Sequence, residues 1–231
     1  MVTTSPEIIL FDIDGTLIST HGAGGRAFKR ALREQIGAVA PLDLVFAGGT
    51  DRALAREGLA SAGLDVDEAM VDRVLERYLT YLEGALRESH RYTVFSGVMD
   101  TLDALSERDD MAVGLGTGNI ERGARIKLAH GGLNDYFSFG GFGCDAADRG
   151  ELIRAGAMRG AARLGASIED CRIVVVGDTT RDVAAAKTIG AECLAVTTGG
   201  GSREELMATG ATHCVDSLAD PRALKMMVGG R

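Results

Sequence analysis

Four short apolar runs, each followed closely by glycine and then by helical periodicity, most constrain the fold of this 231-residue chain. The runs are rich in β-branched residues and do not alternate with polar ones, which is typical of strands buried on both faces of a parallel sheet. Strand and helix alternate along the chain, and this predicts an open, doubly wound α/β fold. The runs are residues 8–11, 112–115, 173–176 and 193–196, and the helical segments are residues 100–108, 120–130, 151–164 and 182–189.

One long interval interrupts this alternation. Between residues 18 and 92 we find helical periodicity and no convincing strand. Apolar residues recur at helical spacing from Phe28 to Ile36, and again from Met70 to Leu86 after a segment that can cap a helix. We therefore expect a helical cap of residues 18–92, inserted into a core made of residues 1–17 and 93–231.

The charge balance excludes several classes of partner. Lys and Arg total 25 against 33 Asp and Glu, so the net charge is −8. A chain of this charge repels nucleic acid unless it carries a basic stripe, and we interpret its densest basic stretches, residues 26–30 and 122–127, as exposed faces of amphipathic helices. No apolar stretch has the length of a membrane span, the first residues do not resemble a signal peptide, and the four cysteines form no Cys-x-x-Cys pair. We expect a cytoplasmic monomer or homodimer with no membrane or nucleic-acid partner.

Acidic residues follow two of the predicted strands. Asp12 and Asp14 come after the first, and Asp178 and Asp182 come after the strand at 173–176. Ligands of open α/β sheets bind beyond the carboxyl ends of the strands, so these carboxylates should share one rim. Like charges this close need a cation among them, and oxygen ligands combined with a substrate phosphate suit Mg²⁺. The sequence therefore predicts a magnesium site at this rim.

The same rim offers groups for phosphoryl transfer. A carboxylate can attack phosphorus, and Asp12 is the first candidate for this nucleophile. Asp14, two residues further on, can reach the same substrate, and a neighbouring charge raises its pKa as general acid–base catalysis requires. Thr117 and the amides of the glycine-flanked turn after it can donate to phosphoryl oxygens. Together these groups can align a nucleophile and stabilise the transferred group.

These residues resemble the motifs of a known family. Phe11-Asp12-Ile13-Asp14-Gly15-Thr16-Leu17 is similar to the first motif of the haloacid dehalogenase superfamily of phosphohydrolases, in particular its phosphoglycolate-phosphatase-like branch. Thr117-Gly118-Asn119 resembles the second motif, and residues 177–182 resemble the fourth. The resemblance spans nearly the whole chain. It implies a Rossmann-like core with a helical cap inserted after the first motif.

The resemblance also implies a role for each residue. Asp12 would form an aspartyl-phosphate, and Asp14 would protonate the leaving alcohol and then activate water. The Asp12 carboxylate, the Asp14 backbone carbonyl and Asp178 would hold Mg²⁺. Asp182 would support this site through water or by orienting the basic residue of the third motif. The second motif would bind phosphate through Thr117, Gly118 and Asn119.

The third motif departs from the pattern of the family, which usually has a lysine there. This chain has Arg149, which can clamp a phosphoryl group with two hydrogen bonds but differs from lysine in geometry. In the cap, residues 48–51 resemble the segment that faces the active site in this branch, and other basic residues lie near the predicted hinge. The cap candidates for recognising the leaving group are His21, Arg26, Lys29, Thr50 and Asp51.

We predict Mg²⁺-dependent hydrolysis of a small phosphomonoester, with 2-phosphoglycolate as the substrate that the resemblance suggests. A phosphomutase of the β-phosphoglucomutase type shares the core motifs, but its cap carries Ser-Arg where this chain has Thr50-Asp51. A haloacid dehalogenase needs neither Asp14 nor Mg²⁺. A phosphonate hydrolase needs a cap lysine for a Schiff base, and Lys29 leaves that alternative open. A non-catalytic phosphate-binding regulator should lack a core carboxylate, and all four are present.

Overall fold

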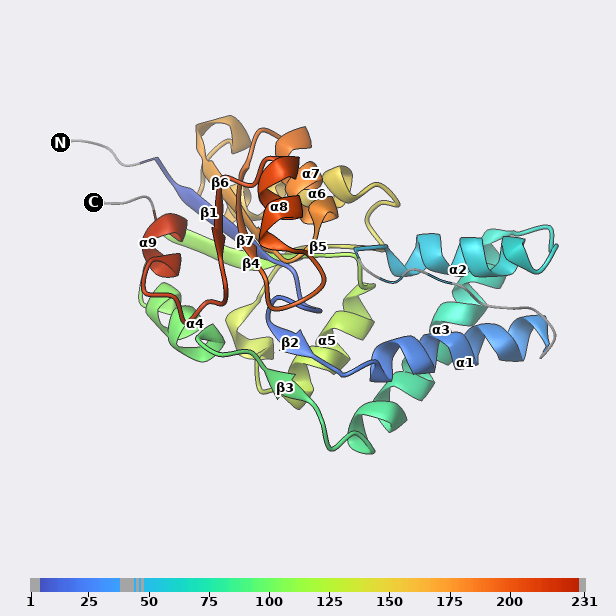
Figure 1. Ribbon diagram of the computed structural model, residues 1–231. Helices are drawn as coiled ribbons and strands as arrows, with labels where there is room; N and C mark the ends of the chain where they lie inside the picture. Colours follow the sequence, from blue (N-terminus) through green and yellow to red (C-terminus); the bar gives the residue numbers. More distant parts are fainter. Residues whose placement is uncertain (1–4, 38–43, 45, 47, 229–231) are drawn as a thin grey trace.

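The core of the protein is a six-stranded parallel sheet with helices on both faces (Figure 1). The computed structural model describes residues 5–37, 44, 46 and 48–228. In the described residues the strand order is β5-β4-β1-β6-β7-β8, so β1 lies inside the sheet between β4 and β6. The strands are β1 (Glu7–Phe11), β4 (Met111–Thr117), β5 (Gly140–Phe142), β6 (Arg172–Gly177), β7 (Glu192–Val196) and β8 (His213–Val215).

The pattern of burial explains why β1 shows no alternation in its sequence. Ile9 and Phe11 face one apolar cluster, whereas Ile8 and Leu10 face another on the opposite side of the sheet. Helices α4 (Val98–Ser106), α5 (Glu121–His130) and α9 (Ala223–Met227) contribute to the first cluster. Helices α6 (Arg149–Arg163), α7 (Thr180–Thr188) and α8 (Arg203–Thr209) contribute to the second. The predicted α/β class and doubly wound architecture are confirmed.

Two strands of the sheet were not anticipated. β5 and β8 have three residues each, and β5 reads Gly-Gly-Phe. Segments this short are below the length at which periodicity separates a strand from a loop. They extend the sheet at its two edges and leave the position of β1 unchanged.

A helical unit lies to one side of the sheet (Figure 1). It consists of α1 (Ala23–Ile36), α2 (Asp51–Ser61) and α3 (Glu68–Arg87), which pack around their own apolar cluster containing Phe28, Leu59 and Tyr78. Strands β2 (Ile18–Ser19) and β3 (Thr93–Val94) pair antiparallel where the chain enters and leaves this unit. The prediction that residues 18–92 contain no strand is therefore wrong at β2, because two residues show no period. We propose that this unit is the expected cap, with residues 1–17 and 93–231 as the core.

Within the described part of the chain, no helix is long and apolar enough to cross a membrane.

Candidate active site

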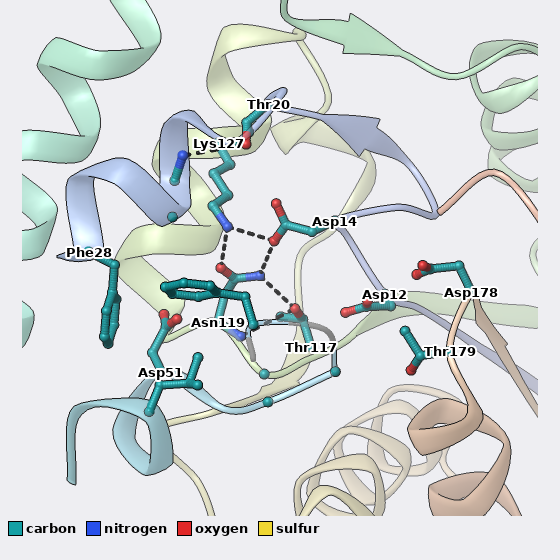
Figure 2. A pocket seen from close by; sticks show the side chains of 18 of the residues that line it. Asp12, Asp14, Thr20, Phe28, Asp51, Thr117, Asn119, Lys127, Asp178 and Thr179 are labelled. Atoms are coloured by element: carbon teal, nitrogen blue, oxygen red, sulfur yellow. Dashed lines mark hydrogen bonds and ion pairs between the residues drawn. The ribbon is translucent and has the colours of Figure 1, made fainter. Parts of the chain in front are cut away.

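A cavity of about 280 Å³ lies at the carboxyl ends of β1, β4 and β6, and residues of the helical unit line its other side. Figure 2 shows side chains that line it. Most of the residues predicted for the site meet here, although Asp182, Thr50, His21, Arg26 and Lys29 are not part of the cavity wall. On the core side the lining includes Asp12, Asp14, Thr117, Gly118, Asn119, Lys127, Arg149 and Asp178, and on the cap side it includes Thr20, Phe28, Phe46, Asp51, Leu54 and Tyr78.

Arg149 is the cation nearest to the predicted nucleophile. It lies at the start of α6 and is buried, with Nη2 3.0 Å from Asp12 Oδ1 and 2.5 Å from Asp182 Oδ1. Its Nη1 donates to the carbonyl oxygen of Gly48 at 3.2 Å. Arg149 thus joins two core carboxylates to the segment that precedes α2.

Asp178 is held by groups from two further segments of the chain. Thr16 Oγ1 donates to Asp178 Oδ1 at 3.1 Å, and the Gly200 amide donates to Oδ2 at 2.9 Å. A Cβ atom on Gly199 would lie 1.8 Å from Asp178 Oδ2, so only glycine fits at that position. This contribution was not anticipated from the sequence, because a run of glycines has no side chain that marks a site.

Three buried carboxylates gather around the nucleophile. Asp12, Asp178 and Asp182 each offer an oxygen, and these oxygens lie within 4.8 Å of one another. Burial raises the pKa of Asp12 to about 7, against the opposing effect of Arg149, and raises the pKa of Asp178 to about 6. The neighbouring carboxylates contribute to both of these raised values. These carboxylates therefore need additional positive charge in order to ionise together. Closely spaced oxygen donors of this kind fit a hard divalent cation such as Mg²⁺.

A second polar cluster surrounds Asp14. Lys127 Nζ lies 2.6 Å from Asp14 Oδ2 and donates to Asn119 Oδ1 at 2.7 Å. Asn119 Nδ2 donates at 2.9 Å to both Asp14 Oδ2 and Thr117 Oγ1 (Figure 2). Burial lowers the pKa of Lys127, but the acidic groups around it, Asp14 foremost and then Tyr78 and Asp51, together more than offset this, and the net shift is upward. Lys127 is therefore an ammonium that anchors one oxygen of Asp14.

The interpretation of residues 122–127 as an exposed face is wrong at Lys127, which is buried. The signal that could have placed this residue correctly is helical spacing. Lys127 follows Ala124 by three positions and precedes Leu128, and both of these face the core. It therefore lies on the inner stripe of α5, whereas Arg122 lies on the outer side.

The cap contacts the second motif directly. The amide of Asp51 donates to the carbonyl oxygen of Gly118 at 2.8 Å, and the Ile120 amide donates to Asp51 Oδ2 at 2.9 Å. Thr50 caps α2 by accepting a hydrogen bond from the Ala53 amide at 3.3 Å. A Cβ on Gly118 would lie 2.2 Å from the carbonyl oxygen of Gly49, so this contact needs glycine. The beginning of α2 is thereby fixed against the loop after β4.

The remaining cap candidates lie outside the cavity wall. The His21 ring bonds to Thr93 Oγ1 at 3.1 Å, and Arg26 Nη1 donates to the carbonyl oxygen of His21 at 3.0 Å. Lys29 Nζ lies 5.6 Å from the centre of the Phe46 ring. Among the five cap candidates, Asp51 alone is in the wall.

The chain belongs to the haloacid dehalogenase-like hydrolase family, whose model matches residues 9–196. It is 30% identical to the phosphoglycolate phosphatase of Pseudomonas putida over 205 residues, which cover 85% of this chain and 71% of that one. It is 28% identical to the probable phosphatase IndB of Dickeya dadantii, over 92% of this chain and 90% of that one. Among solved structures it is similar to CbbY from Rhodobacter sphaeroides in complex with phosphate, with a TM-score of 0.72 and 21% identity over 93% and 95% of the chains. The chain is a phosphoric monoester hydrolase of the phosphoglycolate-phosphatase-like branch, as the motifs predicted.

Proposed function

We propose that this enzyme hydrolyses a small phosphomonoester with Mg²⁺, through a phosphoryl group carried by Asp12. The observation that carries the proposal is the pairing of Asp12 with Arg149 inside a cluster of buried carboxylates. Asp14 lines the same cavity. A cation beside a carboxylate favours its ionised form, and the same cation can neutralise an incoming phosphate.

The first step is attack on phosphorus by an Asp12 oxygen. A phosphorus–oxygen bond forms to Asp12 as the ester bond breaks, and the leaving alcohol takes a proton from Asp14. Thr117 Oγ1 accepts from the amide and from Nδ2 of Asn119, at 3.3 and 2.9 Å, so its own proton is free to bind a phosphoryl oxygen. The carboxylates of Asp12 and Asp178 and the carbonyl of Asp14 would hold the metal, which supplies positive charge against the phosphoryl oxygens.

Asp14 also serves the second step. Lys127 and Asn119 both bind its Oδ2, and no described residue hydrogen-bonds to its Oδ1. This free oxygen can give a proton to the alcohol and later take one from water. The water oxygen then bonds to phosphorus as the bond to Asp12 breaks, which releases phosphate and restores both carboxyl groups.

The size of the cavity favours a small leaving group. Its volume of about 280 Å³ is just below the range of about 300–1,000 Å³ that is usual for ligand pockets. 2-Phosphoglycolate, the substrate in the names of several relatives, is small enough. It also brings a carboxylate into the part of the cavity that receives the leaving group.

Phosphate release from p-nitrophenyl phosphate, measured with and without Mg²⁺, tests the proposal. We expect release by the wild type with Mg²⁺, and none without metal or from Asp12→Asn. Asp135→Asn makes the same change at an exposed position of the core and should keep wild-type activity. Release that survives Asp12→Asn or the removal of metal would refute the mechanism.

A further inference from the structure

The leaving group of a substrate bound at Asp12 must extend toward the cap. Figure 2 shows Asp12 and Asp178 at one end of the cavity and Phe28 and Asp51 at the other, with Asp14 between them. A phosphoryl group at Asp12 therefore places its alcohol against the cap end. We call this end the leaving-group wall, and it consists of Phe28, Phe46, Asp51, Leu54 and Tyr78.

Most of the leaving-group wall is apolar. The Phe28 ring packs edge-on against Phe46 and Tyr78, with centroids 5.7 and 5.0 Å apart. Leu54 completes this surface. Apart from the Tyr78 hydroxyl, which lies beside Lys127, these side chains contact carbon atoms well and give a charged group no compensation for the water that it loses.

The charged residue of the leaving-group wall is an acid. Asp51 is buried, and its Oδ2 accepts the Ile120 amide, but no described residue donates to Oδ1. No described cation lies within ion-pair distance of this carboxyl group, although the charge of Lys127 reaches it and partly opposes the effect of burial on its pKa. Asp51 therefore offers an acceptor to a hydroxyl or amino group and repels a carboxylate.

The cations of the cavity are already paired with acids. Among the described lining residues only Lys127 and Arg149 are basic, and they lie 2.6 Å from Asp14 and 3.0 Å from Asp12, respectively. The Lys127 ammonium also interacts with the Tyr78 hydroxyl, and a carboxylate on the substrate would have to share its charge with Asp14. Residues 38–43, 45 and 47, which the structure does not describe, include no Lys, Arg or His.

We propose that the site accepts phosphomonoesters whose leaving alcohol is uncharged or cationic and carries a hydrogen-bond donor for Asp51, and that it rejects leaving groups bearing a carboxylate, glycolate included. This inference rests on the proposed phosphatase activity. It narrows the substrate class and separates this chain from the substrate in the names of its relatives.

Three esters with a two-carbon leaving group test the inference, because they differ chiefly in charge. We would compare kcat/KM for 2-phosphoglycolate, 2-hydroxyethyl phosphate and 2-aminoethyl phosphate at pH 8 with saturating Mg²⁺. Like charges brought together in a buried site are strongly unfavourable, so we expect the neutral and cationic esters to exceed 2-phosphoglycolate by about tenfold or more. A kcat/KM for 2-phosphoglycolate that equals or exceeds either of the others overturns the inference.

Asp51→Asn tests the residue itself. Asparagine keeps an oxygen for the Ile120 amide but loses the charge. The ratio of kcat/KM for 2-phosphoglycolate to that for 2-hydroxyethyl phosphate should be about tenfold higher in the variant than in the wild type. Comparing the same ratio in the two proteins cancels any difference in the intrinsic reactivity of the two esters. Asp65→Asn, at an exposed position of the cap, should leave this ratio unchanged. An unchanged ratio in Asp51→Asn overturns the assignment, and the wild-type series decides the inference if the variant does not fold.

The outcomes also separate this inference from the function on which it rests. No phosphate release from the three esters or from p-nitrophenyl phosphate refutes the phosphatase proposal and the inference together. Hydrolysis of p-nitrophenyl phosphate with a preference for 2-phosphoglycolate refutes the inference alone. Hydrolysis of p-nitrophenyl phosphate but of none of the three esters also counts against it, because the wall should admit uncharged alcohols of this size.

Discussion

Lys127→Met removes the ammonium that fixes Asp14 and retains a long, unbranched side chain at a buried position. Lys127 Nζ lies 2.6 Å from Asp14 Oδ2 and 2.7 Å from Asn119 Oδ1. The Lys127 side chain is 6% exposed, whereas that of Asp14 is 40% exposed. After the substitution Asp14 therefore keeps Asn119 and gains water, but it loses its charged partner.

The exposure of Asp14 sets the expected size of the effect. Breaking a fully buried ion pair costs about 3–5 kcal/mol, and a hydrogen bond to a charged group contributes about 1.5–3 kcal/mol. Because Asp14 can be rehydrated, we expect the free energy of unfolding to fall by about 2 kcal/mol, which lowers Tm by about 4–8 °C in a chain of this size. General acid–base catalysis contributes about 10²–10⁴-fold, and a misplaced Asp14 should cost about 10²-fold in kcat.

The choice of substrate separates a positioning role from a structural one. An alkyl phosphate needs a proton on its leaving oxygen, whereas p-nitrophenolate leaves without one. Both substrates share the second step, so kcat/KM, which reports the transfer to Asp12, is the quantity to compare. Its loss in Lys127→Met should be much larger for 2-hydroxyethyl phosphate than for p-nitrophenyl phosphate. It should also add little to the loss in Asp14→Asn, because the two residues act as a unit. Lys187→Met, at an exposed lysine, is the control. Equal losses for the two substrates would refute the role of Lys127 in positioning Asp14. Losses that add fully when Lys127→Met and Asp14→Asn are combined would refute it as well.

Two further predictions concern the buried charges. Arg149→Ala should lower turnover by orders of magnitude. Because it leaves Asp12 and Asp182 without their cation, it should also lower the free energy of unfolding, measured in the absence of metal, by about 3–5 kcal/mol. Urea unfolding in EDTA or in Mg²⁺ measures the change in stability. Unchanged activity would reject Arg149 as the basic residue of the third motif. Burial raises the pKa of Asp51 from 3.8 to about 6, so the folded state resists its ionisation and loses stability as pH rises through this window. The stability of Asp51→Asn relative to wild type should therefore grow by about 1.4 kcal/mol from pH 5 to 7.5, and a constant difference would contradict this.

The core and its carboxylates were predictable because their signals are local. The apolar runs of β1, β4, β6 and β7 mark buried parallel strands, and parallel strands bring their carboxyl ends to one edge. Asp12 and Asp178 could therefore be placed at one rim before any contact was known. Strands β2, β5 and β8 could not be found, because two or three residues carry no periodicity.

The cap side of the site depended on contacts that no local pattern reveals. Lys127 is 113 residues away from Asp14, and only the packing of α5 beneath the cap brings them together. Basic residues near the hinge suggested substrate recognition, yet the buried stripe of α1 runs through Ala27 and Phe28 and leaves Arg26 exposed. Apart from Asp51, the leaving-group wall could not be predicted, because its members come from different helices and loops of the cap.

Trapping the phosphorylated enzyme tests the central claim, that Asp12 carries the phosphoryl group. In Asp14→Asn the first step with p-nitrophenyl phosphate needs no proton donor, whereas hydrolysis of the intermediate lacks its base. Mixing this variant with substrate and Mg²⁺, quenching in acid and mapping peptides by mass spectrometry should reveal a burst of p-nitrophenolate and a phosphoryl group on Asp12. A phosphoryl group on another residue, or a burst without any phosphorylated peptide, would contradict the mechanism.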